Sequence, residues 1–377
     1  MKMKNKRVSD LVIACLFCGL LAAVLLAFLL LPERTFSERE KRWLAEKPEW
    51  KLSGILSGQF EEDAEAWAAD HLPGRDFLVG LSAGTDRFMN LQVTKEIYVG
   101  KSGRLYERPS AYSAETIRRN MSILNTFAEA VGQPVDLVLV PSAGFLMRDD
   151  ITGLKDAYED DRIIGEACAL AGELVRPLEL LPVFEGFAAP EELYYRTDHH
   201  WTSLGAYLCF REYAAEKGRA CLRPEDYTLT KEEGFYGSTY ARACFWNIPP
   251  ESLELWDSGG RYTVRFSDRE KEYESVFFPE HLEEADKYPV FLDGNHPLVT
   301  IRNDSPDAEG KLLVIRDSYS NCLGCFLADA YESVTLADLR YYRQTLSVLC
   351  EEERYDDILF LYSVNNFMSD VNIAMLG

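Results

Sequence analysis

The longest uninterrupted apolar run of the chain lies close to its amino terminus. Residues 11–31 carry no charged side chain, and a helix that rises about 1.5 Å per residue over this length crosses a hydrocarbon layer of about 30 Å. Several basic residues come before the run: Lys2, Lys4, Lys6 and Arg7. The pattern predicts a transmembrane signal anchor at 11–31, with residues 1–10 as a cytoplasmic tail under the positive-inside rule.

A cleaved signal peptide is the alternative interpretation of this run. More basic residues follow it closely, at positions 34, 39, 41 and 42, so the charge asymmetry across it is incomplete. The run is nevertheless long for a signal peptide, and it ends in Leu-Leu-Leu-Pro without the small residues of a cleavage site. We therefore prefer the uncleaved anchor.

Polar and turn-forming residues separate the anchor from the first regular elements. Residues 32–60 combine charges, turn residues and two Trp, which is typical of a membrane-proximal stalk. An amphipathic helix is predicted from Gln59 to Ala69 and is broken by Pro73 and Gly74. Short apolar runs on either side of residues 101–103 predict a small β-hairpin.

From residue 113 onwards the hydrophobic pattern is that of an α/β fold. Residues 135–140 are almost continuously apolar, as in a parallel strand buried on both faces. Helices are predicted over 113–130, 163–175 and 203–217. We expect one domain over 61–377.

The last third of the chain first loses and then regains this pattern. From about 228 to 310 the periodicity fades and only short β-prone runs remain, which we interpret as an insertion. Strands at 311–315, 334–336 and 358–362 then alternate with helices. This alternation implies parallel pairing with right-handed crossovers.

Charge and cysteine content narrow the classes of function. The formal net charge of −22 would repel a phosphate backbone, so nucleic acid is excluded as an expected partner. Nine cysteines leave at least one unpaired, and they do not form a small disulfide-rich scaffold. Cys322 and Cys325 are interpreted as two residues on one helix face rather than as a redox or metal motif.

The candidate chemistry lies in two distant segments. Asp198, His199 and His200 precede the helix at 203–217; a histidine moves protons near neutral pH, and a carboxylate fixes its tautomer. Ser318 follows a buried strand, at a strand-to-helix turn where α/β folds place their ligands. We predict Ser318 as nucleophile, His200 as base and Asp198 as orienting acid. The alternatives are a loop that caps the helix and a serine that serves as an ordinary N-cap.

Other residues are candidates for substrate binding by position and type. Gly237, Ser238 and Asn321 are possible oxyanion donors, although each is also a common turn or helix-surface residue. Trp201, Tyr240 and Trp246 offer flat faces for a sugar ring, although core packing is the commoner fate of such side chains.

Several segments resemble bacterial DHHW proteins. The signature is Thr197-Asp-His-His-Trp-Thr202, and the other matching segments are Thr35 to Leu44, Ala69 to Asp76, Gly234 to Tyr240 and Leu312 to Ser320. DHHW proteins are in turn similar to the SGNH-hydrolase-like domains of alginate O-acetyltransferase proteins, which carry Asp-x-His-Trp upstream of Ser-Tyr-Ser. This chain departs from that group with Arg316-Asp317 before the serine, which leaves the local electrostatics open.

The resemblance implies an SGNH-like parallel sheet with flanking helices and a permuted motif order, in which Asp198 and His200 precede Ser318. It further implies an extracytoplasmic serine acyltransferase or esterase that acts on O-acetyl groups of a cell-surface polysaccharide. The expected partners are this glycan, the membrane through residues 11–31 and a membrane-bound acyl donor protein. No cofactor and no resident metal are expected.

Two alternatives from other classes remain open. One is a non-catalytic envelope protein that binds glycan or assists assembly. The other is a metal-dependent phosphoesterase of the DHH type, in which Asp198, His199 and His200 would hold a divalent cation. The sequence lacks an upstream Asp-x-Asp and a glycine-rich His segment near its carboxyl terminus, which such a site would need.

Overall fold

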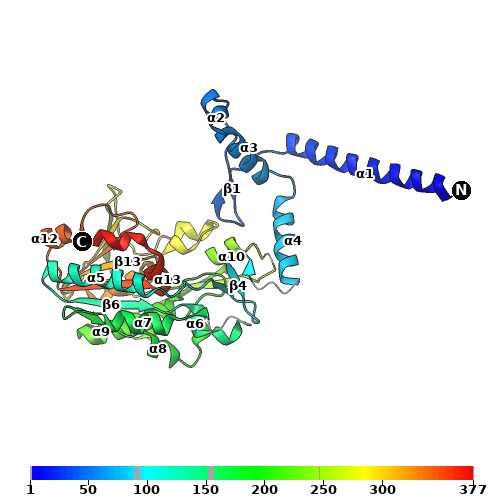
Figure 1. Cartoon of the computed structure of the whole chain (residues 1–377). Helices are drawn as coiled ribbons and strands as arrows, with labels where there is room; N and C mark the ends of the chain where they lie inside the picture. The colour runs from blue at the N-terminus through cyan, green and yellow to red at the C-terminus, as the bar shows by residue number, and fades with distance from the viewer. Residues whose placement is uncertain (1, 89–92, 95, 152–156, 246, 377) are drawn as a thin grey trace. The chain divides into compact units, whose positions relative to one another are not determined.

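The computed structural model describes residues 2–88, 93–94, 96–151, 157–245 and 247–376. The chain forms two compact units, residues 1–90 with 244–246 and residues 91–243 with 247–377 (Figure 1). The three residues predicted to carry the chemistry all lie in the second unit.

The first unit begins with the helix that contains the apolar run. Its Asp10–Leu30 portion is long and apolar enough to cross a membrane. The elements of this unit are α1 (Lys2–Leu30), β1 (Phe36–Ser37), β2 (Arg42–Trp43), α2 (Leu52–Ser57), α3 (Gln59–Asp70) and α4 (Arg75–Phe88). The amphipathic helix predicted after the stalk is α3, and it continues one residue further than expected.

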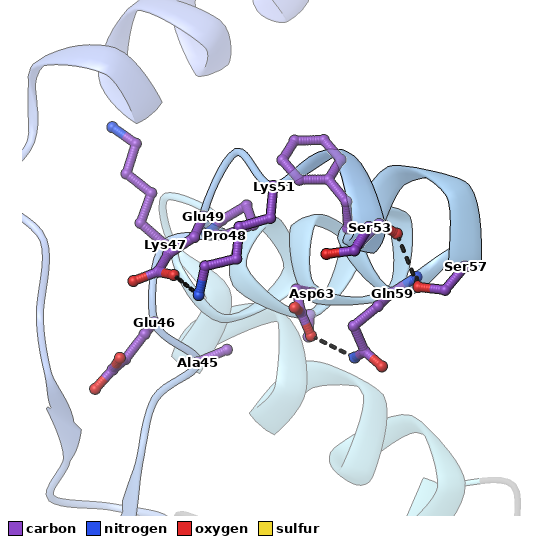
Figure 2. Close-up of a pocket in the computed structure, with 13 residues that line it drawn as sticks. Ala45, Glu46, Lys47, Pro48, Glu49, Lys51, Ser53, Ser57, Gln59 and Asp63 are labelled. Atoms are coloured by element: carbon purple, nitrogen blue, oxygen red, sulfur yellow. Dashed lines mark hydrogen bonds and ion pairs between the residues drawn. The ribbon is translucent and has the colours of Figure 1, made fainter.

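Short elements like these bury little apolar surface, and ion pairs hold them together. Arg42 bonds Asp70 through Nη1 at 2.8 Å, and Arg75 pairs with Glu40 at 2.9 Å. An open hollow of about 840 Å³ lies between the loop at 45–51, α2 and α3 (Figure 2). Side chains of both charges line this hollow, and none of the predicted site residues does.

An eight-stranded sheet forms the centre of the second unit, in the order β11-β10-β12-β14-β13-β15-β6-β7. The strands are β6 (Val135–Val140), β7 (Val175–Pro177), β10 (Tyr262–Phe266), β11 (Glu272–Tyr273), β12 (Leu298–Asn303), β13 (Lys311–Arg316), β14 (Ser333–Asp338) and β15 (Asp357–Ser363). From β14 to β7 the neighbours pair in parallel, as the alternation of strands and helices predicted. The carboxyl ends of β13, β14, β15 and β6 therefore share one edge.

Helices cover both faces of this sheet. The helices of this unit are α5 (Ala114–Val131), α6 (Ala143–Leu146), α7 (Asp160–Ala169), α8 (Leu181–Glu185), α9 (Ser203–Lys217), α10 (Ser238–Ala243), α11 (Ser320–Ala330), α12 (Leu346–Glu352) and α13 (Val364–Ser369), of which α10 packs on the small hairpin at 97–107. Side chains alternate along β13, so that Leu312 and Val314 pack with α9 and α11 while Leu313 and Ile315 pack with α5, α7 and α12. The apolar runs of the sequence thus form the middle layer of a three-layer fold.

Local predictions in this unit are largely confirmed. The hairpin pairs β4 (Ile97–Val99) with β5 (Leu105–Glu107) in antiparallel fashion, and α9 has the predicted bounds. Ser113 caps α5 by accepting a bond from Thr116 N. Gly132 ends α5 in the left-handed region at φ 68°, where a residue without Cβ avoids strain.

The helix predicted over 163–175 is wrong at its carboxyl end. It stops at Ala169, and Val175 begins strand β7 instead. Asn125 of α5 donates to Leu170 O at 3.0 Å and accepts from Gly172 N at 2.9 Å. The side chain of Asn125 thus binds backbone groups that would form helical hydrogen bonds if α7 continued. The local sequence pattern gives no sign of this contact.

The segment at 228–310 also has more regular structure than its pattern indicated. Strand β8 (Thr228–Phe235) pairs in antiparallel fashion with β9 (Glu251–Asp257). Strands β12 and β10 extend the central sheet, because β12 pairs in antiparallel fashion with β14 and β10 does so with β12. Of the helices expected to alternate with the last strands, the one between β14 and β15 is α12, which begins at Leu346.

Candidate active site

Two side chains from other parts of the fold bind the loop that carries the histidines and precedes α9. Arg104, which is buried just before β5, donates to the carbonyls of Tyr194 and Tyr195 at 2.9 and 2.8 Å. Glu251 at the start of β9 accepts from Thr197 N at 2.7 Å and from its hydroxyl. Sequence reasoning missed Arg104 and Glu251, because neither has a spacing that links it to the motif.

The structure brings the three predicted residues into one chain of hydrogen bonds. His200 Nε2 lies 2.8 Å from Ser318 Oγ, and His200 Nδ1 lies 2.6 Å from Asp198 Oδ1. All three side chains are buried. This is the order of contacts in which a carboxylate orients an imidazole and the imidazole accepts a hydroxyl proton.

Electrostatics favour an ionised acid and a neutral base. Burial alone would raise the pKa of Asp198, but attraction to His200 and His199 and bonds from His200 hold it well below its usual range. Burial, followed by repulsion from His199, lowers the pKa of His200 against the pull of Asp198. Near neutral pH, His200 is therefore free of a second proton and able to accept one.

Asp198 is held by a close approach of the chain at Gly237. A Cβ at Gly237 would lie 2.2 Å from the Asp198 Cβ, so only glycine fits. This approach lets Ser238 N donate to Asp198 Oδ2 at 2.6 Å, while Gly237 N donates to Thr197 Oγ1 at 3.0 Å. The Ser238 hydroxyl lies 3.0 Å from His199 Nδ1. The backbone amides of Gly237 and Ser238, two of the predicted oxyanion donors, thus bind the loop that carries Asp198.

Ser318 occupies the turn between β13 and α11. The N-cap position of α11 is Tyr319, without a side-chain cap bond, so Ser318 does not act as an ordinary helix cap. Asp317 accepts from Ser363 N and from the Asn366 side-chain amide, both at 2.8 Å. Its charge therefore points to the end of β15 and is met by donors.

The predicted Asn321 lies in a buried polar cluster beside this turn. Its amide donates to Asn295 Oδ1 at 3.1 Å, and its own oxygen accepts from Arg316 Nη1. Arg316 is fully buried, and burial lowers its pKa. Its Nε and Nη2 have no partner among the described residues. Nothing in the sequence pattern marked Arg316 or Asn295 as neighbours of the site.

The aromatic candidates have different surroundings from those of a sugar platform. Trp201 is fully buried and donates from Nε1 to Tyr319 O at 3.0 Å, which ties the histidine loop to the serine turn. Tyr240 is buried and its ring lies against Tyr236, with centroids 4.2 Å apart. Trp246 lies outside the described residues.

One aromatic contact at the base was not predicted. The ring of Tyr288, from the short 3-10 helix Tyr288–Val290, stacks on the His200 imidazole with centroids 4.0 Å apart and planes 8° apart. Tyr288 is buried and limits the positions that the imidazole can adopt. It lies in the segment whose periodicity fades, 88 positions from its partner in sequence, so no local signal reveals the contact.

The motif also forms a group of potential metal ligands. One ligand atom each from Asp198, His199 and His200 lie within 4.8 Å of one another. Both nitrogens of His200 already face protein partners, Asp198 on one side and Ser318 on the other. A cation bound through His200 would have to displace one of these contacts.

Comparisons with known proteins agree with this architecture. Residues 184–337 match the model of the DHHW protein family, and this match contains all three residues of the hydrogen-bonded chain. Residues 98–238 match a model described as the SGNH hydrolase-like domain of the acetyltransferase AlgX. The predicted family resemblance is therefore confirmed. No curated protein matches the sequence at a significant level.

Solved structures extend the likeness to most of the chain. A DHHW family protein from Eubacterium siraeum is 22% identical with a TM-score of 0.66, and the match covers 75% of this chain and 95% of that one. Bacillus cereus PatB1 with a sulfonyl adduct is 17% identical with a TM-score of 0.63, over 74% of this chain and 98% of that one. At these identities the likeness concerns the fold, and the predicted SGNH-like α/β class is confirmed.

Proposed function

We propose that the chain is an extracytoplasmic serine acyltransferase or esterase that acts on O-acetyl groups of a cell-surface polysaccharide. The observation that carries this proposal is the continuous set of contacts from Ser318 Oγ through His200 to Asp198, at 2.8 and 2.6 Å. The match to an acetyltransferase domain model supports an acetyl group as the group that is transferred. The resemblance to alginate O-acetyltransferase proteins supports a glycan as acceptor.

The first half-reaction transfers the acyl group to the protein. Ser318 Oγ attacks the donor carbonyl while His200 Nε2 takes the hydroxyl proton, and Asp198 stabilises the imidazolium that forms. Collapse of the tetrahedral intermediate breaks the bond to the leaving alcohol, which receives the proton from His200. An acetyl ester on Ser318 remains.

The second half-reaction decides between an esterase and a transferase. His200 takes a proton from either water or a sugar hydroxyl, whose oxygen attacks the acetyl ester. The bond between the acetyl carbon and Ser318 Oγ then breaks, and Ser318 regains its proton from His200. Exclusion of water at this stage favours transfer to the sugar. A membrane-bound acyl donor protein would supply the acetyl group in the transferase case.

We propose the backbone N–H of Ser318 as one oxyanion donor. This amide has no hydrogen-bond partner among the described residues and belongs to the residue that makes the nucleophilic attack. Gly237 and Ser238 are better assigned to positioning Asp198, because their amides are already bonded. Asn321 remains a candidate for a second donor through one of the two N–H groups of its side-chain amide, because only the other N–H is needed for the bond to Asn295.

We also propose that residues 11–31 anchor the chain in the cell membrane as a single span, with residues 32–60 as stalk and the SGNH-like unit outside the cytoplasm. The apolar helix Asp10–Leu30 supports this placement. An envelope polysaccharide is accessible to a catalytic unit on that side.

A pair of serine variants tests the proposal. Ser318→Ala should abolish labelling by a fluorophosphonate, and in the native host it should lower ester-linked acetate on the envelope polymers. Ser320→Ala is the matched control, because its buried hydroxyl lies two residues away and has no partner among the described residues. Labelling that survives in Ser318→Ala would contradict the assignment. A folded native protein without label or esterase activity would favour a glycan-binding role.

The cluster of Asp198, His199 and His200 favours one second candidate, a metal-dependent phosphoesterase. In that case the purified native chain would retain a divalent cation, and a chelator would remove a phosphoesterase activity. Serine labelling at Ser318 that persists in the presence of the chelator would exclude this candidate.

A further inference from the structure

Exposed apolar side chains are concentrated in the first unit. Among the described residues after α1, the large exposed hydrophobic residues of that unit are Leu31, Trp43, Trp50, Leu52, Ile55, Leu56, Leu72, Phe77, Leu78 and Leu81. The much longer second unit exposes Leu229, Tyr341, Val348 and Val371. A cluster of this kind on a small unit marks a surface that is covered by something else.

Helix α4 presents the most regular part of this surface. Phe77, Leu78 and Leu81 are 70%, 47% and 55% exposed and follow one another at the spacing of a single helix face. Ala83, on the opposite side, is buried. We call Phe77, Leu78 and Leu81 the α4 apolar face.

Contacts within the first unit connect this helix to the end of α1. Phe28, in the last turn of α1, meets Trp67 of α3 edge to face, with ring centroids 5.1 Å apart. Phe28, Leu31 and Leu72 line one hollow of about 330 Å³, together with the first residues of α4. Apolar side chains at the end of the candidate span thus lie beside Leu72 and the first turn of α4, which the α4 apolar face follows directly in sequence.

Polar contacts fix this junction at the point where the chain leaves α1. Arg34 pairs with Asp76 in the first turn of α4 at 3.0 Å. His71 bridges the carbonyls of Arg34 and Trp67, at 3.0 and 2.9 Å. Arg34 is only four residues beyond Leu30, so the start of α4 is held near the end of the apolar helix.

We propose that the α4 apolar face inserts into the lipid headgroup and upper acyl region, and that α4 is an interfacial helix beside the membrane span. The proposal rests on α1 as the span. A lipid surface suits this face, because α4 starts beside the end of the span and its first turn carries charges of both signs, Arg75 and Asp76. Interfacial helices of this kind bury their apolar side about 5–10 Å deep. The charge pattern calls for no particular headgroup.

Lipid-phase carbene labelling of the full chain tests this inference. The chain is reconstituted in phosphatidylcholine nanodiscs, an apolar diazirine is photolysed in the bilayer, and labelled residues are located by mass spectrometry. We expect label on α1 and on Phe77, Leu78 and Leu81, and none on the exposed Leu229, Val348 and Val371 of the second unit. The variant in which Phe77, Leu78 and Leu81 are all changed to Ser should lose the α4 label and keep the α1 label.

The internal control separates this inference from the anchor itself. Label on α1 with none on α4 would overturn the inference and leave the anchor standing. Chemical crosslinks from an unlabelled α4 to a second copy, or to the second unit, would identify another occupant and overturn it as well. An unlabelled α1 would overturn both the anchor and the interfacial helix.

Discussion

In the second unit the apolar side chains of the sheet lie between helices, whereas in the first unit short helices turn several of theirs outward. The polar groups of the two units also have different surroundings. The second unit buries Asp198, His200 and Ser318 in a connected chain, while the first unit uses ion pairs such as Arg42–Asp70 to hold its elements together.

Under the proposals above, this difference separates a unit for catalysis from a unit for membrane attachment. A site that depends on distances near 3 Å needs the rigid packing of a large core. A small unit beside an apolar helix needs only enough internal contacts to present its surface. Changes in the second unit should therefore affect chemistry and spare membrane attachment, and changes in the first unit should do the reverse.

The largest expected effect is that of Asp198→Asn. The amide keeps the size of the side chain but no longer stabilises the imidazolium or selects its tautomer, so kcat/KM on an activated acetyl ester should fall by about four orders of magnitude. Because the depressed pKa of Asp198 also contributes stability at neutral pH, thermal unfolding should shift to lower temperature, whereas retention in the membrane should change little. Near-native activity in this variant would contradict the role of Asp198.

Gly237→Ala should have the next largest effect. The added methyl group would overlap Asp198, with 2.2 Å between Cβ atoms, so Asp198 must move. We expect a loss of about 1–3 kcal/mol in the free energy of unfolding and of about 100-fold in kcat/KM. Gly165→Ala is the matched control, because that exposed position in α7 has open space around it and helix propensity favours Ala there by about 1 kcal/mol. Equal effects of the two substitutions would refute the close-approach argument.

Parts of this architecture followed from local patterns. The apolar run at 11–31 is long enough for a helix that crosses a bilayer, the run at 135–140 has the length and composition of a buried strand, and the helix at 203–217 is followed by Gly218. The motif residues Asp198, His200 and Ser318 could be named because a known family carries the same segments. Their contact across the chain was a prediction that the geometry agrees with, and their catalytic roles remain proposals.

Other parts depend on contacts between residues far apart in the chain. The end of α7 is set by Asn125 on another helix, and the antiparallel strands β10 and β12 join a sheet whose parallel strands lie both before and after them in sequence. The contact of Tyr288 with His200 is of the same kind. Such contacts are decided by tertiary packing, which short-range periodicity does not encode.

Asp70→Asn tests the first unit separately. Bonds from Arg42 outweigh burial and lower the pKa of Asp70 to about 2. A carboxylate with a depressed folded pKa stabilises above its unfolded pKa of about 3.9 and loses this contribution as pH falls towards 2, so the variant should cost about 2 kcal/mol at neutral pH. Limited proteolysis should then cut faster within residues 32–88, while fluorophosphonate labelling of Ser318 is unchanged.

Asp63→Asn is the control for this charge removal, because Asp63 lies on the same helix and accepts only from Gln59, at an exposed position. The difference in proteolysis between Asp70→Asn and the native chain should shrink below pH 4. A loss of Ser318 labelling in step with the proteolysis would show that the two units do not act separately.

The smallest expected effect concerns a charged cluster of the second unit that is built around a histidine, whereas the Arg42–Asp70 pair of the first unit contains an arginine. His281 Nε2 lies 2.5 Å from Asp293, and its Nδ1 lies 2.9 Å from Glu284. His296 and Arg269 also contact Asp293. Both nitrogens of His281 face carboxylates, and only the protonated ring can donate to both. Burial opposes this charge, but the bonds to Glu284 and Asp293 raise the pKa of His281 above its usual value.

A raised histidine pKa adds stability that is complete below the unfolded value of about 6.5 and is lost as pH rises through the folded value. Hydrogen exchange of residues 279–296, which include Tyr288, should therefore become faster between pH 6 and 8. The corresponding loss in the free energy of local opening should be less than about 1 kcal/mol, since the cluster is partly exposed. Corrected for intrinsic rates, exchange of residues 59–70 around the Arg42–Asp70 pair should stay constant over this range. His281→Asn should abolish most of the pH dependence at 279–296. Equal pH dependence in both segments would refute the contrast between an arginine-based cluster and a histidine-based one.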